Sequence, residues 1–256
     1  MLKLQPLRGV VSSQKRKNIH NSDIPVVCQA CEARHGGICG ALSSDQLSEL
    51  SKHTQRTAHE RDKPLSREGQ DDSSYSNVLS GVVKLTKLMP DGRQQIVGLQ
   101  FAPDFLGRPF STNDGTVAEA ATNVRLCSFP KSILERFIKE APEMELRLHE
   151  QHMRELDEAR DWMLTLGRKT AVEKVASFLL LIATHIDPEL ENNKSNTTVE
   201  LPLKRADIAD FLGLTIETVS RQLTNLRKKG IIHINDRKSV EIVDMEKLSD
   251  VAEDGS

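Results

Sequence analysis

The stretch LKRADIADFLGLTIETVSRQLTNLRKKGIIHI, residues 203–234, contains two short helical periodicities separated by a glycine. The first predicted helix ends at Gly213, because glycine adopts the left-handed backbone of a tight turn at little cost. Thr215 can accept hydrogen bonds from the free N–H groups of a second helix, which we expect to run to residue 229 and stop at Gly230. Two helices joined in this way predict a helix-turn-helix. The segments GIIHI and SVEIV that follow predict a two-stranded wing.

The charge of this region supports a nucleic-acid interface. Residues 201–240 carry eight Lys and Arg against four Asp and Glu, a local charge of +4 (8 minus 4), whereas the whole chain of 256 residues has a formal charge of −2. A basic face attracts phosphates, and a helix-turn-helix reads bases with the start of its second helix. Arg can pair with guanine, Glu with cytosine, and Ser with a base edge or phosphate. We therefore predict DNA contacts from Glu217, Thr218, Ser220, Arg221, Lys204 and Arg227.

Upstream, the sequence indicates a long helix. Residues 143–166 contain no Gly or Pro, and Pro142 suits a first helical turn. A heptad-like seam with spacings of three and four runs through Leu146, His149, Met153, Leu156, Arg160 and Met163. Such a seam either packs against its own domain or pairs with a second copy, and the residues alone leave both possibilities open.

Residues 27–140 read as a β-rich domain. VLSGVVKLTKLMPDGRQQIVGLQF has two alternating segments around Asp91-Gly92, which predicts a hairpin. Further short strands with Gly and Pro between them favour a sandwich or roll. We expect a mobile tail at 1–26, this domain at 27–140, the long helix at 141–167, the DNA-binding domain at 168–247 and a second tail at 248–256.

The stretch VCQACEARHGGICG, residues 27–40, holds three of the four cysteines. Cys28, Cys31 and Cys39 have the spacing C-x₂-C-x₇-C, and Cys127 follows much later. No apolar run is long enough for a membrane span, and the start does not read as a secretory signal, so we expect a reducing, cytoplasmic location with no disulfides. An iron–sulfur site, a zinc site, a redox or metal-dependent enzyme, and free thiols remain open, although no nucleophile–base set favours an enzyme.

The segment FLGLTIETVSRQLTNLRKKGII resembles the CRP/FNR superfamily of bacterial transcription regulators, and Glu217, Ser220 and Arg221 resemble its FNR/FixK branch. The resemblance covers about residues 27–247. It implies an α+β fold: an N-terminal β-roll of cyclic-nucleotide-binding-like, jelly-roll type as sensor domain, a long dimerisation helix, and a C-terminal winged helix-turn-helix. It also implies a homodimer that reads a palindromic TTGA-type site and contacts RNA polymerase. The dimer seam would use Leu146, Met153, Leu156 and Met163.

The same resemblance implies an effector. FNR-like proteins hold an oxygen-labile 4Fe-4S cluster with three N-terminal cysteines and one from the β-roll, which here correspond to Cys28, Cys31, Cys39 and Cys127. The longer second gap looks like rhizobial FnrN and FixK-type variants. A cyclic nucleotide is not expected, because Gly107 is followed by Arg108 and Pro109 rather than Glu, and no Arg-Ser or Arg-Thr pair follows. We therefore expect an oxygen-responsive activator, with a zinc-bound or metal-free, thiol-based regulator as the alternative. The turn at residues 91–93 is a candidate polymerase-contact surface.

Overall fold

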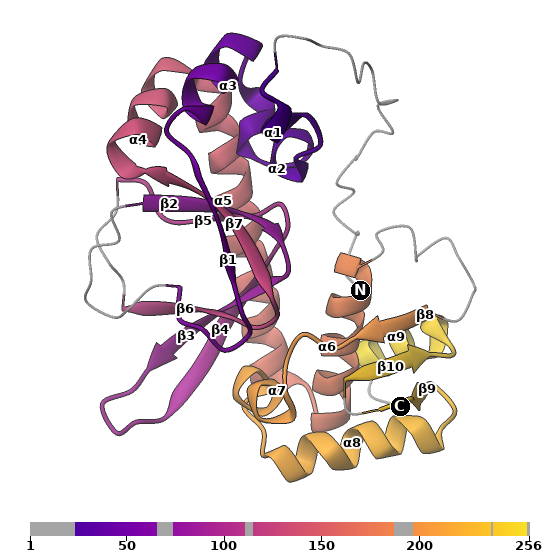
Figure 1. Ribbon diagram of the computed structural model, residues 1–256. Helices are drawn as coiled ribbons and strands as arrows, with labels where there is room; N and C mark the ends of the chain where they lie inside the picture. The colour runs from indigo at the N-terminus through magenta and orange to yellow at the C-terminus, as the bar shows by residue number, and fades with distance from the viewer. Residues whose placement is uncertain (1–23, 66–73, 111–114, 187–196, 237, 255–256) are drawn as a thin grey trace.

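The structure, a computed structural model, describes residues 24–65, 74–110, 115–186, 197–236 and 238–254 (Figure 1). A β-rich domain, a long helix and a C-terminal helical domain follow one another along the chain. The mobile tail that we expected at 1–26 lies almost wholly outside the described residues, as do residues 255–256 of the second tail.

The cysteine-bearing segment folds into short helices, which the sequence reading did not predict. They are α1 (Val26–Gln29), α2 (Glu32–His35), the 3₁₀ helix η1 (Ile38–Ala41) and α3 (Ser44–Ser51). A reciprocal capping box starts α3, because Ser43 accepts from the backbone of Gln46 and the Gln46 side chain accepts from the backbone of Ser43. Leu47 and Leu50 are buried and attach α3 to the β-roll.

Two antiparallel sheets form the β-roll. One has the order β1-β7-β2-β5 and the other β4-β3-β6. The predicted hairpin is confirmed as β3 and β4, with Gly92 at φ +85° in its turn. Val78, Val83, Ala120, Val124 and Leu126 form the core between the sheets. The strands are β1 (Gln55–His59), β2 (Ser74–Ser80), β3 (Val82–Leu88), β4 (Gln94–Phe101), β5 (Phe105–Leu106), β6 (Thr116–Ala120) and β7 (Val124–Pro130).

Three helices follow the roll along the chain, and the last of them belongs to the core of the C-terminal domain. They are α4 (Lys131–Glu140), α5 (Pro142–Arg168) and α6 (Ala171–Ile186). The predicted long helix is confirmed as α5, which has Pro142 in its first turn and runs behind the strands of the roll in Figure 1. Within the described parts of the chain, no helix is both long and apolar enough to cross a membrane.

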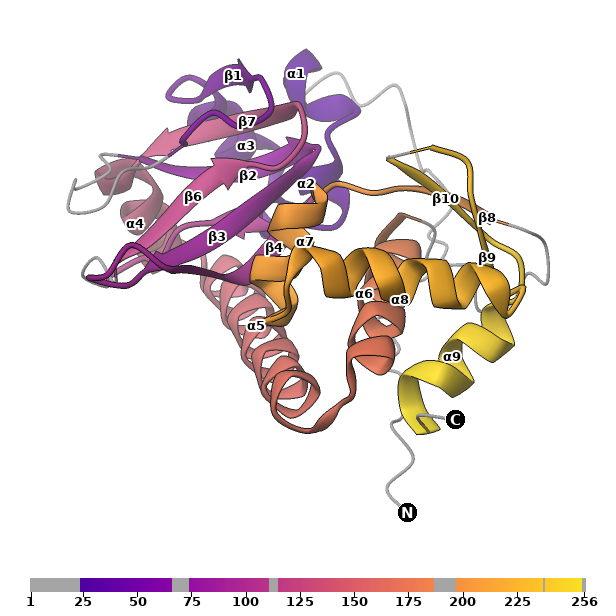
Figure 2. The same ribbon diagram turned by 90° about the horizontal axis from the view of Figure 1, so that it is seen from below.

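The C-terminal domain contains the expected helix-turn-helix. Its helices are α7 (Arg205–Leu212) and α8 (Ile216–Lys228), and Figure 2 shows α8 along the outer side of the domain. Gly213 ends α7 in the left-handed conformation, and Thr215 caps α8 by accepting from Thr218 N at 3.2 Å. The wing strands β9 (Ile232–Ile234) and β10 (Ser239–Ile242) pair as predicted, and β8 (Thr197–Glu200) adds a third strand that was not expected.

The end of the chain differs from the expectation of a tail at 248–256. Residues Met245–Asp254 form α9, and Leu248, Val251 and Ala252 are buried in the core of the C-terminal domain. These apolar residues recur at helical spacing, and their burial against α6 makes the helix part of the domain. The described residues 248–254 are therefore structured.

Candidate cysteine site and DNA-reading helix

The four cysteines come from four different elements and line one small pocket. Cys28 lies in α1, Cys31 caps α2, Cys39 lies in η1 and Cys127 lies in β7. All four are free thiols that share this pocket with apolar side chains of α3 and with Arg34 and Arg56. The folding of the N-terminal helices against the roll thus brings together residues that are far apart in the sequence.

The β-sheet positions the deepest part of this pocket. Cys127 lies in β7, where it is paired with Arg56 of β1 on one side and with Asn77 of β2 on the other. Asn77 is 1% exposed, and its Nδ2 donates a hydrogen bond to Cys39 Sγ at 3.3 Å. Asn77 is a site residue that the sequence reading missed, since an Asn within a strand carries no local signal for a contact with a distant cysteine.

The electrostatics of the pocket favour neutral thiols in the absence of a cation. Burial raises the pKa of Cys127 to about 11, with nearby Cys31 acting in the same direction. Burial, followed by the neighbouring Cys127 and Cys31, raises the pKa of Cys39 far above its usual range. Burial and the nearby Cys31 raise the pKa of Cys28. A bound metal group would supply positive charge that reverses this balance and stabilises thiolates.

The four cysteines of the pocket are possible ligands of more than one kind of metal group. In the described part of the chain, no three His, Cys, Asp or Glu side chains come close enough together to hold a single metal ion. A single zinc needs all its ligands within bonding distance of one point, at roughly 2.3 Å for sulfur. A 4Fe-4S cube binds each cysteine through a different iron, so its ligands stand farther apart. Four thiols lining one pocket supply the number and type of protein ligands that a 4Fe-4S cube takes.

The loop that carries Cys39 packs tightly against the rest of the protein. Neither Gly36 nor Gly37 has a positive φ, so backbone conformation does not explain why glycine stands at these positions. Space is the constraint instead, because a Cβ on Gly37 would lie 2.9 Å from the carbonyl oxygens of both Ala33 and Pro103. A Cβ on Gly40 would lie 2.8 Å from Arg147 Nη1. These glycines let the cysteine loop sit directly on its neighbours.

The cysteine loop is joined to α5 by a shared core. Met144 and Leu148 of α5 are buried in one apolar cluster with Ile38 and Cys39 of η1, and Cys127 packs against the same cluster. Arg147 Nη1 donates to Gly37 O at 3.3 Å. A change in how the cysteines are held would therefore reach α5 directly.

Hydrogen bonds from a buried glutamine also hold α5 against the roll. The buried Gln151 accepts from Phe105 N at 3.2 Å through Oε1 and donates to Phe105 O at 3.1 Å through Nε2. One side chain thus satisfies both backbone groups of a residue in β5. The sequence reading missed Gln151 because it lies outside the heptad-like seam.

The seam of α5 that was predicted for dimerisation faces solvent in the single chain. Leu146 is 57% exposed, Met153 41%, Leu156 42% and Met163 72%. The opposite side of the helix buries Met144 and Leu148 instead. An exposed apolar stripe of this length on a helix is typical of an interface with another protein surface.

The predicted reading face of α8 is also open. Glu217, Ser220 and Arg221 are exposed, while Val219, Leu223 and Leu226 hold the opposite side of the helix in the core. Thr218 is half-buried and hydrogen-bonds to the cap residue Thr215 through both its N–H and its hydroxyl. The pKa of Glu217 is lowered, first by a hydrogen bond to its own backbone N–H and then by one from Thr215.

The two basic residues predicted to support DNA binding lie in different surroundings. Arg227 is exposed in the last turn of α8. Lys204 instead forms an ion pair with Asp62 of the β-roll, with Nζ 2.5 Å from Oδ2. The Lys204 side chain is thus engaged by the β-roll, and its role in DNA binding stays a prediction.

Two family models match this chain. Residues 56–141 match the cyclic nucleotide-binding domain and residues 173–251 match the Crp-like helix-turn-helix domain. A probable transcriptional activator of Rhizobium leguminosarum bv. viciae is 54% identical over 91% of this chain and 96% of its own length. The transcriptional activator protein FnrL of Cereibacter sphaeroides is 36% identical over 91% of this chain and 96% of its own length.

Solved structures give the same result. FixK2 from Bradyrhizobium japonicum superposes with a TM-score of 0.69 at 30% identity, over 77% of this chain and 96% of that one. The chain belongs to the CRP/FNR family of transcription regulators, in its FNR/FixK branch. It is a DNA-binding transcriptional activator of this type, and because its relatives are regulators and not enzymes, the enzyme hypothesis is excluded.

Proposed function

We propose that the protein is an oxygen-responsive activator that holds an oxygen-labile 4Fe-4S cluster through Cys28, Cys31, Cys39 and Cys127. With the cluster intact at low oxygen, it binds a palindromic TTGA-type site as a homodimer. The observation that supports this proposal is that four cysteines from four separate elements line one pocket. Four thiolates are the usual protein ligands of such a cluster.

The shared core explains how such a site would control DNA binding. When bound, the cluster supplies a reaction with oxygen that changes how its cysteine ligands are held. Cys39 packs in the same apolar cluster as Met144 and Leu148, and Arg147 donates to the cysteine loop. Movement of this loop would shift α5 and bias its pairing with a second copy, which is what a two-state switch requires.

The exposed face of α5 is the proposed dimer surface. It carries Leu146, Met153, Leu156 and Met163 outside the core of the chain. Pairing of two α5 helices would present two α8 helices, and a two-fold protein dimer reads a palindrome. The turn at residues 91–93, where Arg93 pairs with Asp91 at 2.8 Å, is an exposed surface for contact with RNA polymerase. Such a regulator acts on bacterial DNA in the cytoplasm.

The first test is metal content after purification without oxygen. We expect about four irons and four sulfides per chain, with a broad visible absorbance that changes on exposure to air. His35 is the one histidine of the cysteine segment, so a zinc site with mixed ligands could use it. A His35→Ala variant should therefore keep its full iron content if the cysteines hold a cluster.

Two results would contradict the proposal. If the purified protein contains about one zinc per chain and the His35→Ala variant loses it, the site is a zinc site and not an iron–sulfur site. A colourless, metal-free protein that still binds the palindromic duplex in air would leave a regulator whose sensor is not a metal group. Either result leaves the DNA-binding assignment intact.

A further inference from the structure

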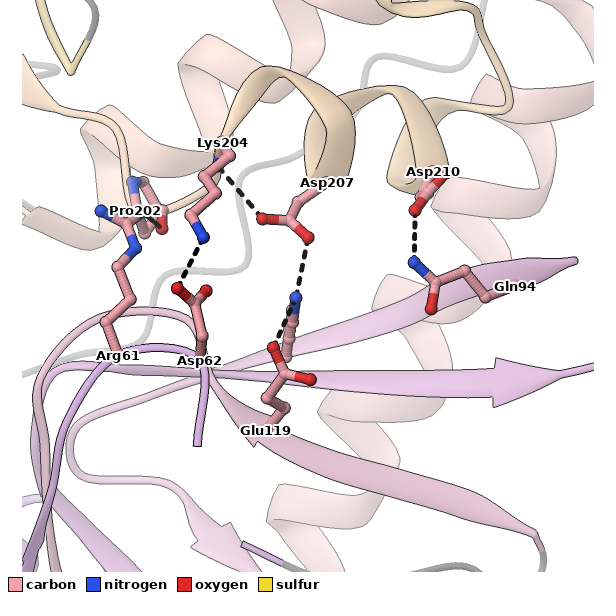
Figure 3. Close-up of polar contacts among 9 residues, drawn as sticks. Arg61, Asp62, Gln94, Glu119, Pro202, Lys204, Asp207 and Asp210 are labelled. Carbon is pink, nitrogen blue, oxygen red and sulfur yellow. Dashed lines mark hydrogen bonds and ion pairs between the residues drawn. The ribbon is translucent and has the colours of Figure 1, made fainter. Parts of the chain in front are cut away.

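A buried lysine joins the sensor domain to the helix-turn-helix. Lys84 of β3 is 7% exposed, and its Nζ lies 2.8 Å from Glu119 Oε1 of β6 and 2.7 Å from Asp207 Oδ1 of α7. Figure 3 shows the two carboxylates, Glu119 on the roll and Asp207 on α7, on the two sides of this contact. Burial by itself lowers the pKa of Lys84, but hydrogen bonds to Asp207 and Glu119 outweigh it and the pKa stands above its usual value. The ammonium therefore stays charged between two carboxylates from different domains.

Further polar contacts hold α7 along its length. At its start, Lys204 pairs with Asp62, and Arg61 donates to the carbonyl oxygen of Pro202. Near its end, Gln94 Nε2 donates to Asp210 Oδ2 at 2.6 Å. Gln95 Nε2 donates at 3.0 Å to Phe211 O, one of the carbonyls that the end of a helix leaves without an intrahelical partner.

An apolar contact lies beside this polar set. Ile96, Leu99 and Phe101 of β4 are buried in the same cluster as the core of the C-terminal domain. Trp162 of α5 packs on Phe211 of α7, with ring centroids 4.5 Å apart. The interface therefore combines apolar burial with directional ion pairs, and the ion pairs restrict the orientation of α7 more narrowly than apolar contact alone does.

The position of α8 follows from that of α7. Leu214 N donates to Ala209 O across the turn, and Gly213 fixes the turn geometry. Val219 and Leu223 of α8 are buried in the same core as Ile208 and Leu212 of α7. The reading residues Glu217, Ser220 and Arg221 of α8, in contrast, stay exposed.

We infer that Lys84 is a positioning residue for DNA recognition: by binding Asp207 it holds α7 on the β-roll and sets where α8 lies relative to the dimer helix. Two recognition helices must meet half-sites about one helical turn apart. The covalent link between α5 and α6, residues 169–170, does not by itself fix that distance. Through the contact with Asp207, the sensor domain sets the distance between the two α8 helices of a dimer, and this distance determines the preferred spacing of the half-sites.

The sharpest variant is Asp207→Asn. It leaves the Lys84–Glu119 pair within the roll, and the amide can still accept from Lys204 N as the carboxylate does at 3.3 Å. Removing a negative charge from a DNA-binding domain would by itself tighten DNA binding. Weaker DNA binding by Asp207→Asn would therefore indicate that α7 and α8 are no longer held in position. Asp250→Asn, at an exposed site on α9, makes the same change of charge and serves as the matched control.

The measurement is affinity for three duplexes at one salt concentration. The first is a site selected from random DNA by the wild-type protein, and the others have one base pair added or removed between the half-sites. We expect Asp207→Asn to bind the selected site about 5- to 150-fold more weakly. We also expect it to lose most of the preference for the correct spacing. Simple destabilisation would lower all three affinities together and leave their ratios unchanged.

A double-mutant cycle with Lys84→Met completes the test. If the two residues act through one contact, the double variant should be no weaker than the more affected single variant. The inference would be overturned if Asp207→Asn kept the wild-type ratios of affinity among the three duplexes, or if it bound DNA as tightly as Asp250→Asn does. It would also be overturned if the losses of affinity in the two single variants multiplied in the double variant. Because the site is selected by the protein itself, the test does not depend on the TTGA sequence, and all variants are compared without oxygen so that any bound cluster stays intact.

Discussion

The reading helix and the cysteine pocket represent two opposite ways of building a functional site. The reading residues of α8 lie on one exposed face of a single helix, whose cap and buried stripe are encoded within residues 215–228. The pocket combines α1, α2, η1 and β7, and its polar partner Asn77 comes from β2. The first site needs only a correctly placed helix, whereas the second exists only when two distant parts of the chain are packed together.

The two regions should respond differently to substitution. Changes in the pocket should spread to α5, because Cys39 and Leu148 share one core. Changes on α8 should stay local, because its reading side chains make few contacts within the protein.

Cys127→Ser should remove the bound metal group altogether. The serine is close in size, so the β-roll should remain folded, but it does not supply the fourth thiolate. Iron content after anaerobic purification should fall to near zero, and site-specific DNA binding without oxygen should be lost. Circular dichroism provides the control for folding. Full iron content in this variant would exclude the four-cysteine site.

Leu148→Ala should destabilise the fold by about 2–5 kcal/mol, because it leaves a cavity in the core that α5 shares with the cysteine loop. Leu146→Ala is the matched control on the exposed side of the same helix. It should change monomer stability by less than about 0.5 kcal/mol and weaken dimerisation instead. Urea unfolding and sedimentation, each at several protein concentrations, separate the two effects. Equal destabilisation by both variants would contradict the proposed dimer face.

Arg221→Ala should cost about 1–3 kcal/mol in binding to the specific site and relax the preference for one base, as expected for the loss of a base contact. Arg227→Ala should weaken binding to all sequences alike and reduce the salt dependence, as expected for a phosphate contact. Affinities for matched and mismatched duplexes at several salt concentrations distinguish the two roles. If Arg221→Ala kept the same base preference, Arg221 would not be a base-reading residue.

Thr215→Ala should cost about 1 kcal/mol of stability, because it removes the side-chain cap that accepts from Thr218 N. Thr224→Ala is the control within the same helix. Its hydroxyl only bonds back to Ser220 O, an interaction that contributes little to a helix, so its effect should stay within about 0.5 kcal/mol. Thermal unfolding of both variants measures the difference, and a larger effect at Thr224 would show that the cap is not the dominant local interaction.

Several features could be predicted because their signals are local. Gly213 and Thr215 mark the turn of the helix-turn-helix, Asp91-Gly92 marks the hairpin, and the absence of Gly and Pro marks α5. The short helices around the cysteines and the third wing strand β8 were missed. Each is too short to show a periodicity of its own, and each is stabilised by packing against distant residues.

The reading helix, the length of α5 and the set of cysteines available as ligands follow from local sequence, because caps, apolar periodicity and residue chemistry act over a few neighbouring positions. It is the folded arrangement of the chain that places the four thiols in one pocket, buries Asn77 and Gln151 as polar partners, and joins Lys84 to Asp207. Burial and ion pairing between residues far apart depend on how sheets and helices are arranged, and no local pattern encodes that arrangement.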